Sequence, residues 1–156
     1  MYEHHVSLEK GFEKGVLIVG GGLGAARTAE QLRRAEYTGP IVIVSDEVHV
    51  PYDRPPLSKE VLRKEVDDTA LKPREWYDEK DITLRLGSAA TGLDTAAQTL
   101  TLADGSVLGY DELVIATGLV PRRIPTIPDL EGIRVLRSFD ESLALREHAS
   151  AGRSTA

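Results

Sequence analysis

The chain contains 156 residues, 41% of them hydrophobic and 28% charged, and carries a net charge of −6. This composition predicts a single globular domain with a moderate core and leaves little room for two complete domains. The acidic balance, without a basic run, disfavours nucleic acid as a partner, and no apolar stretch approaches the ~20 residues needed to cross a membrane. Residues 1–15 lack the pattern of a signal peptide, so we expect a cytoplasmic protein.

The sequence contains no cysteine. The chain therefore has no disulfide, no thiolate metal site and no dithiol redox pair of its own. Its four histidines show no ligand spacing with nearby acids, so we expect no metal site.

The stretch Val16–Ala25 carries the main fold prediction. Four apolar residues, typical of a buried strand, run directly into a glycine-rich turn, and Gly24–Ala35 has the spacing of an amphipathic helix. The end of the strand sets the fingerprint Gly-x-Gly-x-x-Ala at Gly20, Gly22 and Ala25. We expect Gly20 to permit the tight turn and Gly22 to let a pyrophosphate approach the backbone. Strand, turn and helix predict the opening of a dinucleotide-binding βαβ unit, although a glycine-rich turn can also be only a tight connection.

A second parallel strand is predicted at Ile41–Val44, and Asp46 follows its end. A carboxylate about twenty residues beyond the glycines can accept hydrogen bonds from a ribose diol and would repel a 2′-phosphate. The alternative interpretation of Asp46 is a solvated loop acid.

The proline-rich stretch Pro51–Lys59 is predicted to be extended and stiff. Ser58 can cap a short helix at Lys59–Lys64, in which Glu60 and Lys64 have the spacing of an ion pair. The spacing leaves two interpretations open: a surface loop with solvated cations, or a rigid segment that holds Arg54 and Lys59 for binding.

Further elements follow in the middle of the chain. Pro73 is placed to start a short helix whose Trp76 and Tyr77 are expected to cover the sheet edge or core, rather than stack on a cofactor. Three strands are predicted to form a small antiparallel meander, with a hairpin turn between the last two: Asp81–Leu86, Thr99–Leu102 and Val107–Tyr110.

The next predicted strand, Leu113–Ala116, is buried and parallel, and it ends in Thr117-Gly118. Strand ends in open α/β sheets face the ligand crevice, so Ala116, Thr117 and Gly118 are candidates for cofactor contact. A short strand is expected at Ile133–Leu136. A capping box at Ser138–Glu141 predicts a helix to about Ala149.

Together the motifs resemble a known family. They occur in the order Val16–Ala25, Asp46-Glu47, Pro51–Lys59, Tyr110–Gly118 and Val135–Arg137. The chain resembles the N-terminal FAD portion of ferredoxin reductases of the putidaredoxin, rhodocoxin and rubredoxin reductase type, within the FAD-dependent pyridine nucleotide oxidoreductase superfamily. The resemblance covers roughly 16–151. It implies an α/β fold: a Rossmann-like FAD-binding domain with a parallel sheet, helices and a small antiparallel β-meander.

The resemblance also implies a set of FAD-binding residues. Those expected at the adenosine and pyrophosphate half are Gly20, Gly22, Gly24, Asp46 and the backbone of Ala90. Those expected along the flavin half are Arg54, Lys59 and Arg137. Lys59 is the candidate catalytic residue, because a cation beside the ring favours the anionic reduced flavin.

The same resemblance implies an NAD(P)H-dependent reductase that passes single electrons to a ferredoxin-type iron–sulfur protein. A complete member continues into an NAD-binding domain with its own glycine fingerprint, returns to the FAD domain and ends in an interface domain. This sequence has none of these, so we expect a truncated fold, with 1–15 as a loose extension, 16–120 as the first FAD-binding segment and 121–156 as a connection and helix. NAD(P)H would serve as donor only in a complete enzyme, and we expect little or no NADH oxidation from this chain alone. The alternatives are a non-catalytic nucleotide-binding or assembly module completed by a partner chain, and a βαβ unit that binds NAD.

Overall fold

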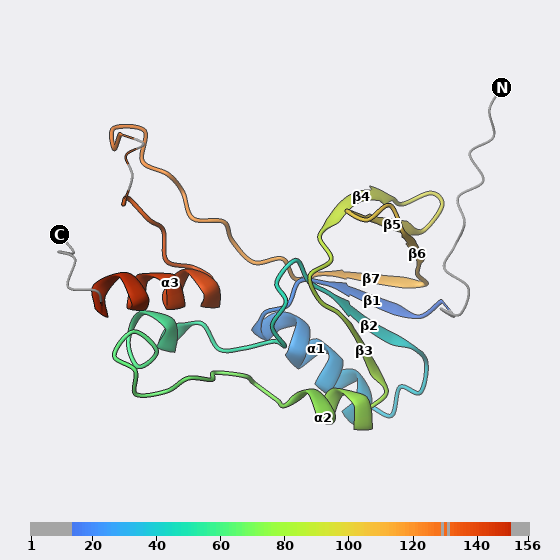
Figure 1. Cartoon of the computed structure of the whole chain (residues 1–156). Coiled ribbons are helices and arrows are strands. Elements are labelled where there is room, and N and C mark those ends of the chain that lie inside the picture. Colours follow the sequence, from blue (N-terminus) through green and yellow to red (C-terminus); the bar gives the residue numbers. More distant parts are fainter. Residues whose placement is uncertain (1–13, 129, 131, 151–156) are drawn as a thin grey trace. The chain divides into compact units, whose positions relative to one another are not determined.

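A computed structural model describes residues 14–128, 130 and 132–150 (Figure 1). The chain divides into two compact units. Within the described residues, the first unit contains 14–52 and Leu71–Gly118, and the second contains Asp53–Ala70 and the residues that follow Gly118. No helix in the described part of the chain is long and apolar enough to cross a membrane.

The first unit is built on a four-stranded parallel sheet with the order β3-β2-β1-β7. β1 (Val16–Val19) pairs with β2 (Ile41–Val44) on one side and with β7 (Glu112–Ile115) on the other. β2 also pairs with β3 (Ile82–Arg85). The continuous apolar runs of β1 and β2, rich in valine and isoleucine, are typical of strands buried on both faces. The predicted βαβ opening and the return of a parallel strand near residue 113 are therefore confirmed. The prediction that this last strand is buried is wrong: β7 is an edge strand, and its residues are half-buried or exposed.

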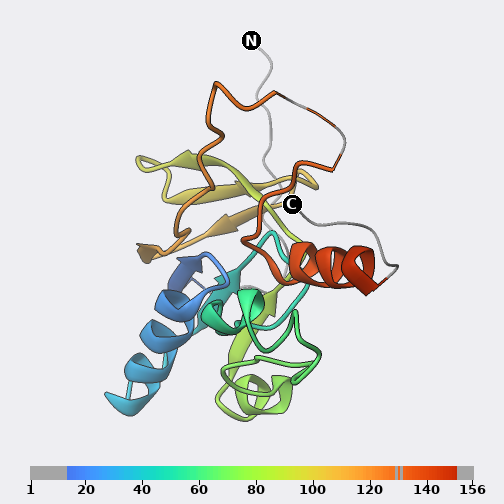
Figure 2. The same ribbon diagram turned by 90° about the vertical axis from the view of Figure 1, so that its left-hand side faces the viewer.

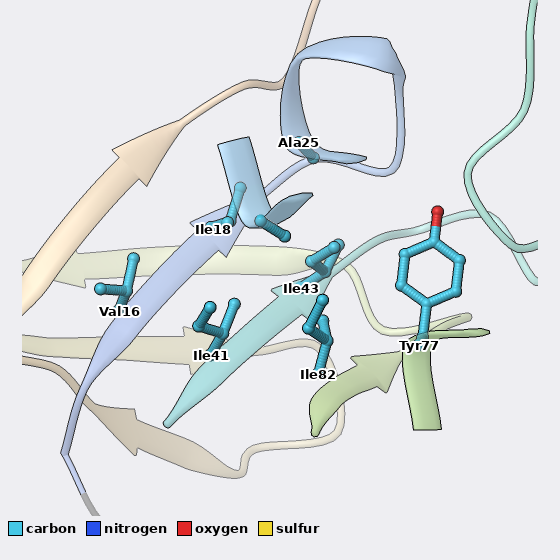
Figure 3. Packing of buried hydrophobic residues seen from close by; sticks show 8 residues of the cluster. Val16, Ile18, Ala25, Ile41, Ile43, Tyr77 and Ile82 are labelled. Atoms are coloured by element: carbon cyan, nitrogen blue, oxygen red, sulfur yellow. The ribbon is translucent and has the colours of Figure 1, made fainter. Parts of the chain in front are cut away.

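Two helices cover one face of this sheet: α1 (Leu23–Arg34) and α2 (Arg74–Glu79). Alternate residues of β1 and β2 point into the core that they form, shown close up in Figure 3. The buried members of this core are Val16, Ile18, Ala25, Ala29, Ile41, Ile43, Tyr77 and Ile82. Trp76 packs against the same core, as expected for a side chain that covers the sheet.

The other face of the parallel sheet is covered by a three-stranded antiparallel sheet, β4 (Ala90–Asp94), β5 (Thr99–Leu102) and β6 (Val107–Gly109). Figures 1 and 2 show α1 and α2 on the opposite side of the parallel strands from this second sheet. The residues between the sheets are Leu17, Val42, Val44, Leu100, Leu102, Leu108 and Tyr110. The unit thus has three layers and two apolar cores.

The antiparallel meander is made of different strands from those predicted. Ile82–Arg85 is the edge strand of the parallel sheet, beside β2, and not the first strand of the meander. That first strand is β4, which was not predicted because all five of its residues are exposed and show no apolar alternation. The predicted hairpin between β5 and β6 is confirmed.

Arg33 is a structural residue whose role the helix pattern does not reveal. Its guanidinium donates hydrogen bonds to four carbonyl oxygens, at distances of 2.7–2.8 Å. Two acceptors, Tyr37 and Gly39, lie in the loop after α1, and the other two, Lys80 and Asp81, lie between α2 and β3. The planar guanidinium thereby ties together two connections far apart in sequence.

The second unit contains η1 (Pro55–Ser58), a 3-10 helix, and α3 (Phe139–Ser150). The helix predicted at Lys59–Lys64 is wrong: the helical turn begins at Pro55, because proline favours a first turn, and Lys59 leaves helical geometry at φ −130° and ψ −97°. Residues 59–64 form turns, so Glu60 and Lys64 do not gain helical spacing. The predicted strand at Ile133–Leu136 is also wrong, since these residues form no ladder.

Candidate functional site

The glycine turn after β1 lies at the carboxyl end of the parallel sheet. Gly20 adopts a φ of +121°, and a Cβ there would overlap the carbonyl of Ala116. The backbone on both sides is fixed, because the Gly20 amide donates to Val44 O at 2.8 Å and the Ala116 amide donates to Val19 O at 2.7 Å. Gly20 is therefore required by both backbone conformation and close packing.

Gly22, two residues later, has open space around it. It precedes α1 with φ −98°, and a Cβ built on it meets no heavy atom within 4 Å. α1 begins without a side-chain cap and without an acidic residue in its first turn. The first-turn amides of a helix have no partner within the helix, and together with the positive end of the helix dipole they favour an anion. The cradle is thus suited to a phosphate group, and Gly24, whose Cβ would contact Ala116 Cβ at 3.7 Å, follows in the same turn.

Gly21 lies against Ser45, a contact that sequence reasoning did not identify. A Cβ on Gly21 would overlap Ser45 Oγ and approach Ser45 Cβ at 2.8 Å. Ser45 is buried at the end of β2, and its Oγ accepts a 3.2 Å hydrogen bond from the Glu47 amide. The glycine turn and the loop after β2 are therefore packed directly on each other.

That loop carries Asp46, whose side chain is exposed. Its neighbour Glu47 accepts a 2.5 Å hydrogen bond from the hydroxyl of Tyr52. Two further backbone bonds hold the loop, from Gly87 to the Glu47 carbonyl at 2.9 Å and from Ser88 to the Ser45 carbonyl at 2.7 Å. Asp46 is consequently an exposed carboxylate on a restrained loop, as a ribose-binding role requires.

The remaining candidates of the first unit gather near the same strand ends. Ala90 begins β4 two residues after Ser88, which is bonded to the end of β2. Ala116 follows β7 beside the glycine turn, and Thr117 and Gly118 after it are exposed. The candidates of the first unit therefore follow the carboxyl ends of β1, β2 and β7 or begin β4: Gly20, Gly22, Gly24, Asp46, Ala90, Ala116, Thr117 and Gly118.

The three cationic candidates, Arg54, Lys59 and Arg137, all belong to the second unit. Arg54 Nη1 donates to the carbonyl oxygen of Arg137 at 2.7 Å, and Arg137 Nε donates to the Leu119 carbonyl at 3.1 Å. Lys59 terminates η1, its side chain is exposed, and it has no ion-pair partner among the described residues. The structure therefore connects the two arginines and leaves the lysine charge uncompensated.

The predicted capping box at the start of α3 is confirmed. The Glu141 amide donates to Ser138 Oγ at 3.3 Å, while the Glu141 carboxylate accepts from the amides of Ser138 at 2.8 Å and Arg137 at 2.7 Å. Burial raises the pKa of this carboxyl, but these hydrogen bonds and the charge of Arg54 outweigh it and hold the pKa below its ordinary value. Glu141 is therefore charged at neutral pH.

The amino-acid sequence matches the family described as pyridine nucleotide-disulphide oxidoreductase over residues 14–155. The chain belongs to this family. The match spans nearly the whole chain and includes the glycine turn, the proline-rich stretch and α3.

Individual relatives are ferredoxin reductases. The ferredoxin–NAD(+) reductase component of the p-cumate 2,3-dioxygenase system from Pseudomonas putida is 39% identical over 143 residues, which cover 90% of this chain and 36% of that protein. The crystal structure of the ferredoxin reductase for the CYP199A2 system from Rhodopseudomonas palustris superimposes with a TM-score of 0.81 at 34% identity, covering 89% of this chain and 35% of the other.

The reductase in a covalent putidaredoxin reductase–putidaredoxin complex gives a TM-score of 0.79 at 32% identity, covering 87% of this chain and 34% of the other. The chain thus spans about a third of the length of these proteins and has the fold of their corresponding portion.

Proposed function

We propose that this chain binds FAD and is the flavin-binding part of an NAD(P)H-dependent ferredoxin-type reductase. The observation that carries the proposal is the open cradle at Gly22, which lies between an uncapped helix and the carboxyl ends of parallel strands. A dinucleotide fits this position because its pyrophosphate can approach the backbone and accept hydrogen bonds from the first-turn amides of α1. The ferredoxin reductases among the relatives support FAD as the dinucleotide.

The residues divide into two halves under this proposal. The first-turn amides of α1 bind the pyrophosphate, Asp46 binds the adenosine ribose, and the backbone of Ala90 contacts the adenine. When bound, FAD would supply a hydride acceptor for NAD(P)H and a donor of single electrons to an iron–sulfur protein.

Arg54, Lys59 and Arg137 serve the flavin half. Lys59 is exposed and has no ion pair within the described residues, so its ammonium group is accessible to an adjacent ligand. Near the isoalloxazine this charge favours the anionic reduced form and raises the reduction potential. Arg54 and Arg137, linked through the Arg137 carbonyl, provide a second positive region with defined geometry.

A spectroscopic FAD titration tests the proposal. The purified chain is expected to shift the visible absorption of added FAD and to retain the flavin on gel filtration. Gly22→Ala fills the open space without a steric contact in the protein, so it should preserve folding and weaken FAD binding by roughly tenfold or more.

Gly92→Ala is the matched control, since this residue lies in β4 and its added Cβ would make only a 3.4 Å contact with Thr101. Its FAD affinity should equal that of the unmodified protein. Absence of FAD binding by the unmodified chain, or equal binding by Gly22→Ala, would refute the proposal. Stronger binding of NAD than of FAD would assign the cradle to the other dinucleotide.

A second candidate function is an assembly module that is completed by a partner chain. Its support is the exposed side of β7, where Ile115 retains 67% of its accessible surface. Sedimentation over a range of concentrations tests it: self-association would favour a homomeric form, and a strictly monomeric chain would contradict that form.

A further inference from the structure

In the second unit, α3 contacts the proline-rich segment through directed polar bonds. Ser142 is fully buried, and its hydroxyl donates to the carbonyl oxygen of Leu57 in η1 at 2.6 Å. Arg146, one turn later, lies 3.4 Å from the carbonyl oxygen of Val61 and donates to Asp67 at 2.8 Å. The four-residue spacing on α3 thus matches the four-residue spacing of the two carbonyls.

These bonds explain why a serine occupies the buried position of α3. Carbonyls at the end of a short helix lack a partner within it, and a buried unpaired carbonyl is costly. The Ser142 hydroxyl supplies the donor that the Leu57 carbonyl needs. A hydrogen bond is directional, whereas two apolar surfaces can shift along each other. The bond from Ser142 to Leu57 therefore fixes the position of η1 and of the adjoining Lys59 relative to α3.

Glu141 fixes the neighbouring arginines in a similar way. Its carboxylate accepts hydrogen bonds from the amides of Arg137 and Ser138. The second of these bonds orients the peptide group between Arg137 and Ser138. The carbonyl oxygen of Arg137 belongs to that same peptide and accepts the bond from Arg54 Nη1 at 2.7 Å. A continuous chain of hydrogen bonds therefore leads from Glu141 to the guanidinium of Arg54.

We propose that Glu141 and Ser142 are positioning residues for the flavin half of the site. Glu141 orients Arg54 through the peptide of Arg137, and Ser142 holds η1 with Lys59 at its end. The inference rests on the proposed function, because it concerns how residues assigned to the flavin are held. It makes α3 a functional element of the FAD site rather than only a connection to a following domain.

Comparison of ADP with FAD tests this inference in the full chain. ADP contains only the groups assigned to the first unit, whereas FAD adds the flavin half. Glu141→Ala and Ser142→Ala should each weaken FAD binding roughly tenfold, the effect of losing about one hydrogen bond, and leave ADP binding unchanged. Glu141→Gln keeps an acceptor oxygen and should lose less. Glu147→Ala and Ser150→Ala, on the same helix, are the matched controls and should change neither affinity.

A double variant separates positioning from general destabilisation. If Glu141 acts through Arg54, then Glu141→Ala should add no further loss of FAD affinity to Arg54→Ala. Additive losses, an equal loss of ADP binding, or unchanged FAD binding by both single variants would overturn the inference.

Hydrogen exchange provides a cofactor-free measurement. The Leu57 and Lys59 amides donate within the η1 segment, to Arg54 O and Pro56 O, each at 3.0 Å. Both should exchange faster in Ser142→Ala and at the unmodified rate in Ser150→Ala, and unchanged exchange in Ser142→Ala would overturn the positioning role. A chain that binds ADP but not FAD would instead refute the proposed function, and this measurement would still decide whether Ser142 holds η1.

Discussion

Gly21→Ala is expected to destabilise the protein although Gly21 occupies a variable position of the fingerprint. The added Cβ would overlap Ser45 Oγ and lie 2.8 Å from Ser45 Cβ. Ser45 cannot withdraw, because its amide donates to Arg85 O at 2.9 Å and its carbonyl accepts from Ser88 at 2.7 Å. Parallel-sheet and loop bonds thus hold the serine against the turn.

The magnitude follows from the two atoms that collide. Overpacking a well-filled site costs about 1–3 kcal/mol, which we expect for Gly21→Ala alone. Ser45→Gly removes both colliding atoms and loses the 3.2 Å bond to the Glu47 amide, so it should cost about 1–2 kcal/mol. In the double variant the alanine no longer meets an obstacle, and its cost should be close to that of Ser45→Gly alone, a coupling of about 1–3 kcal/mol.

Urea unfolding of the four proteins, followed by circular dichroism, measures this coupling. Gly22→Ala is the control within the same turn and should change the free energy of unfolding by less than about 0.5 kcal/mol, because its Cβ meets nothing. Additive effects of the two substitutions would refute the packing argument. So would equal stabilities of Gly21→Ala and Gly22→Ala.

Three further predictions concern other residues. Burial and, second, a nearby carboxylate raise the pKa of Tyr77 to about 12, and its buried hydroxyl has no hydrogen-bond partner in the described part of the chain. Because the tyrosine of the unfolded chain has a pKa near 10, the free energy of unfolding should fall as pH rises from 10 to 12. In thermal melts, Tyr77→Phe should reduce this fall, and at pH 7 it should leave the stability unchanged or increase it. Arg33→Ala leaves four carbonyls without their donor and should cost about 2–3 kcal/mol in urea unfolding, whereas exposed Arg34→Ala should cost less than about 0.5 kcal/mol. Because the pKa of Glu141 is lowered in the folded protein, its carboxylate stabilises the fold above pH 4.5, and this stabilisation is lost as pH falls through the folded-state pKa. Glu141→Gln should therefore weaken the dependence of the unfolding free energy on acidic pH. An unchanged pH dependence in this variant would contradict the argument.

The strands that could be predicted are those with a strong buried pattern. β1 and β2 carry continuous apolar runs, and the glycine turn defines where β1 ends. The apolar run Leu113–Ala116 predicted β7 as a strand, although β7 contains no buried residue. Ile82–Arg85 was recognised as a strand but assigned to the wrong sheet, because four residues with one buried end fit either sheet. β4 consists of five exposed residues and is recognisable only from its pairing with β5, which local sequence does not encode.

Polar residues that fix tertiary geometry were harder to predict than the strands. Arg33 bonds carbonyls 47 and 48 residues away, and Ser142 bonds a carbonyl 85 residues away. Neither residue sits in a motif. The capping box at Ser138–Glu141 was predictable because its partners are three residues apart. Its second effect, on Arg54 through Arg137, depends on the fold and so could not be predicted.

The three consecutive glycines of the turn show how a motif and a structure inform each other. Gly20 is required by a positive φ and by the Ala116 carbonyl, and Gly21 is required by Ser45. Neither requirement involves a ligand, so both would persist in a chain that binds nothing. Gly22 has an ordinary φ of −98° and open space, so the fold alone would accept a side chain there. A glycine that folding does not require is the one whose absent side chain most directly indicates a ligand, and for that reason Gly22 carries the FAD proposal more strongly than the fingerprint as a whole.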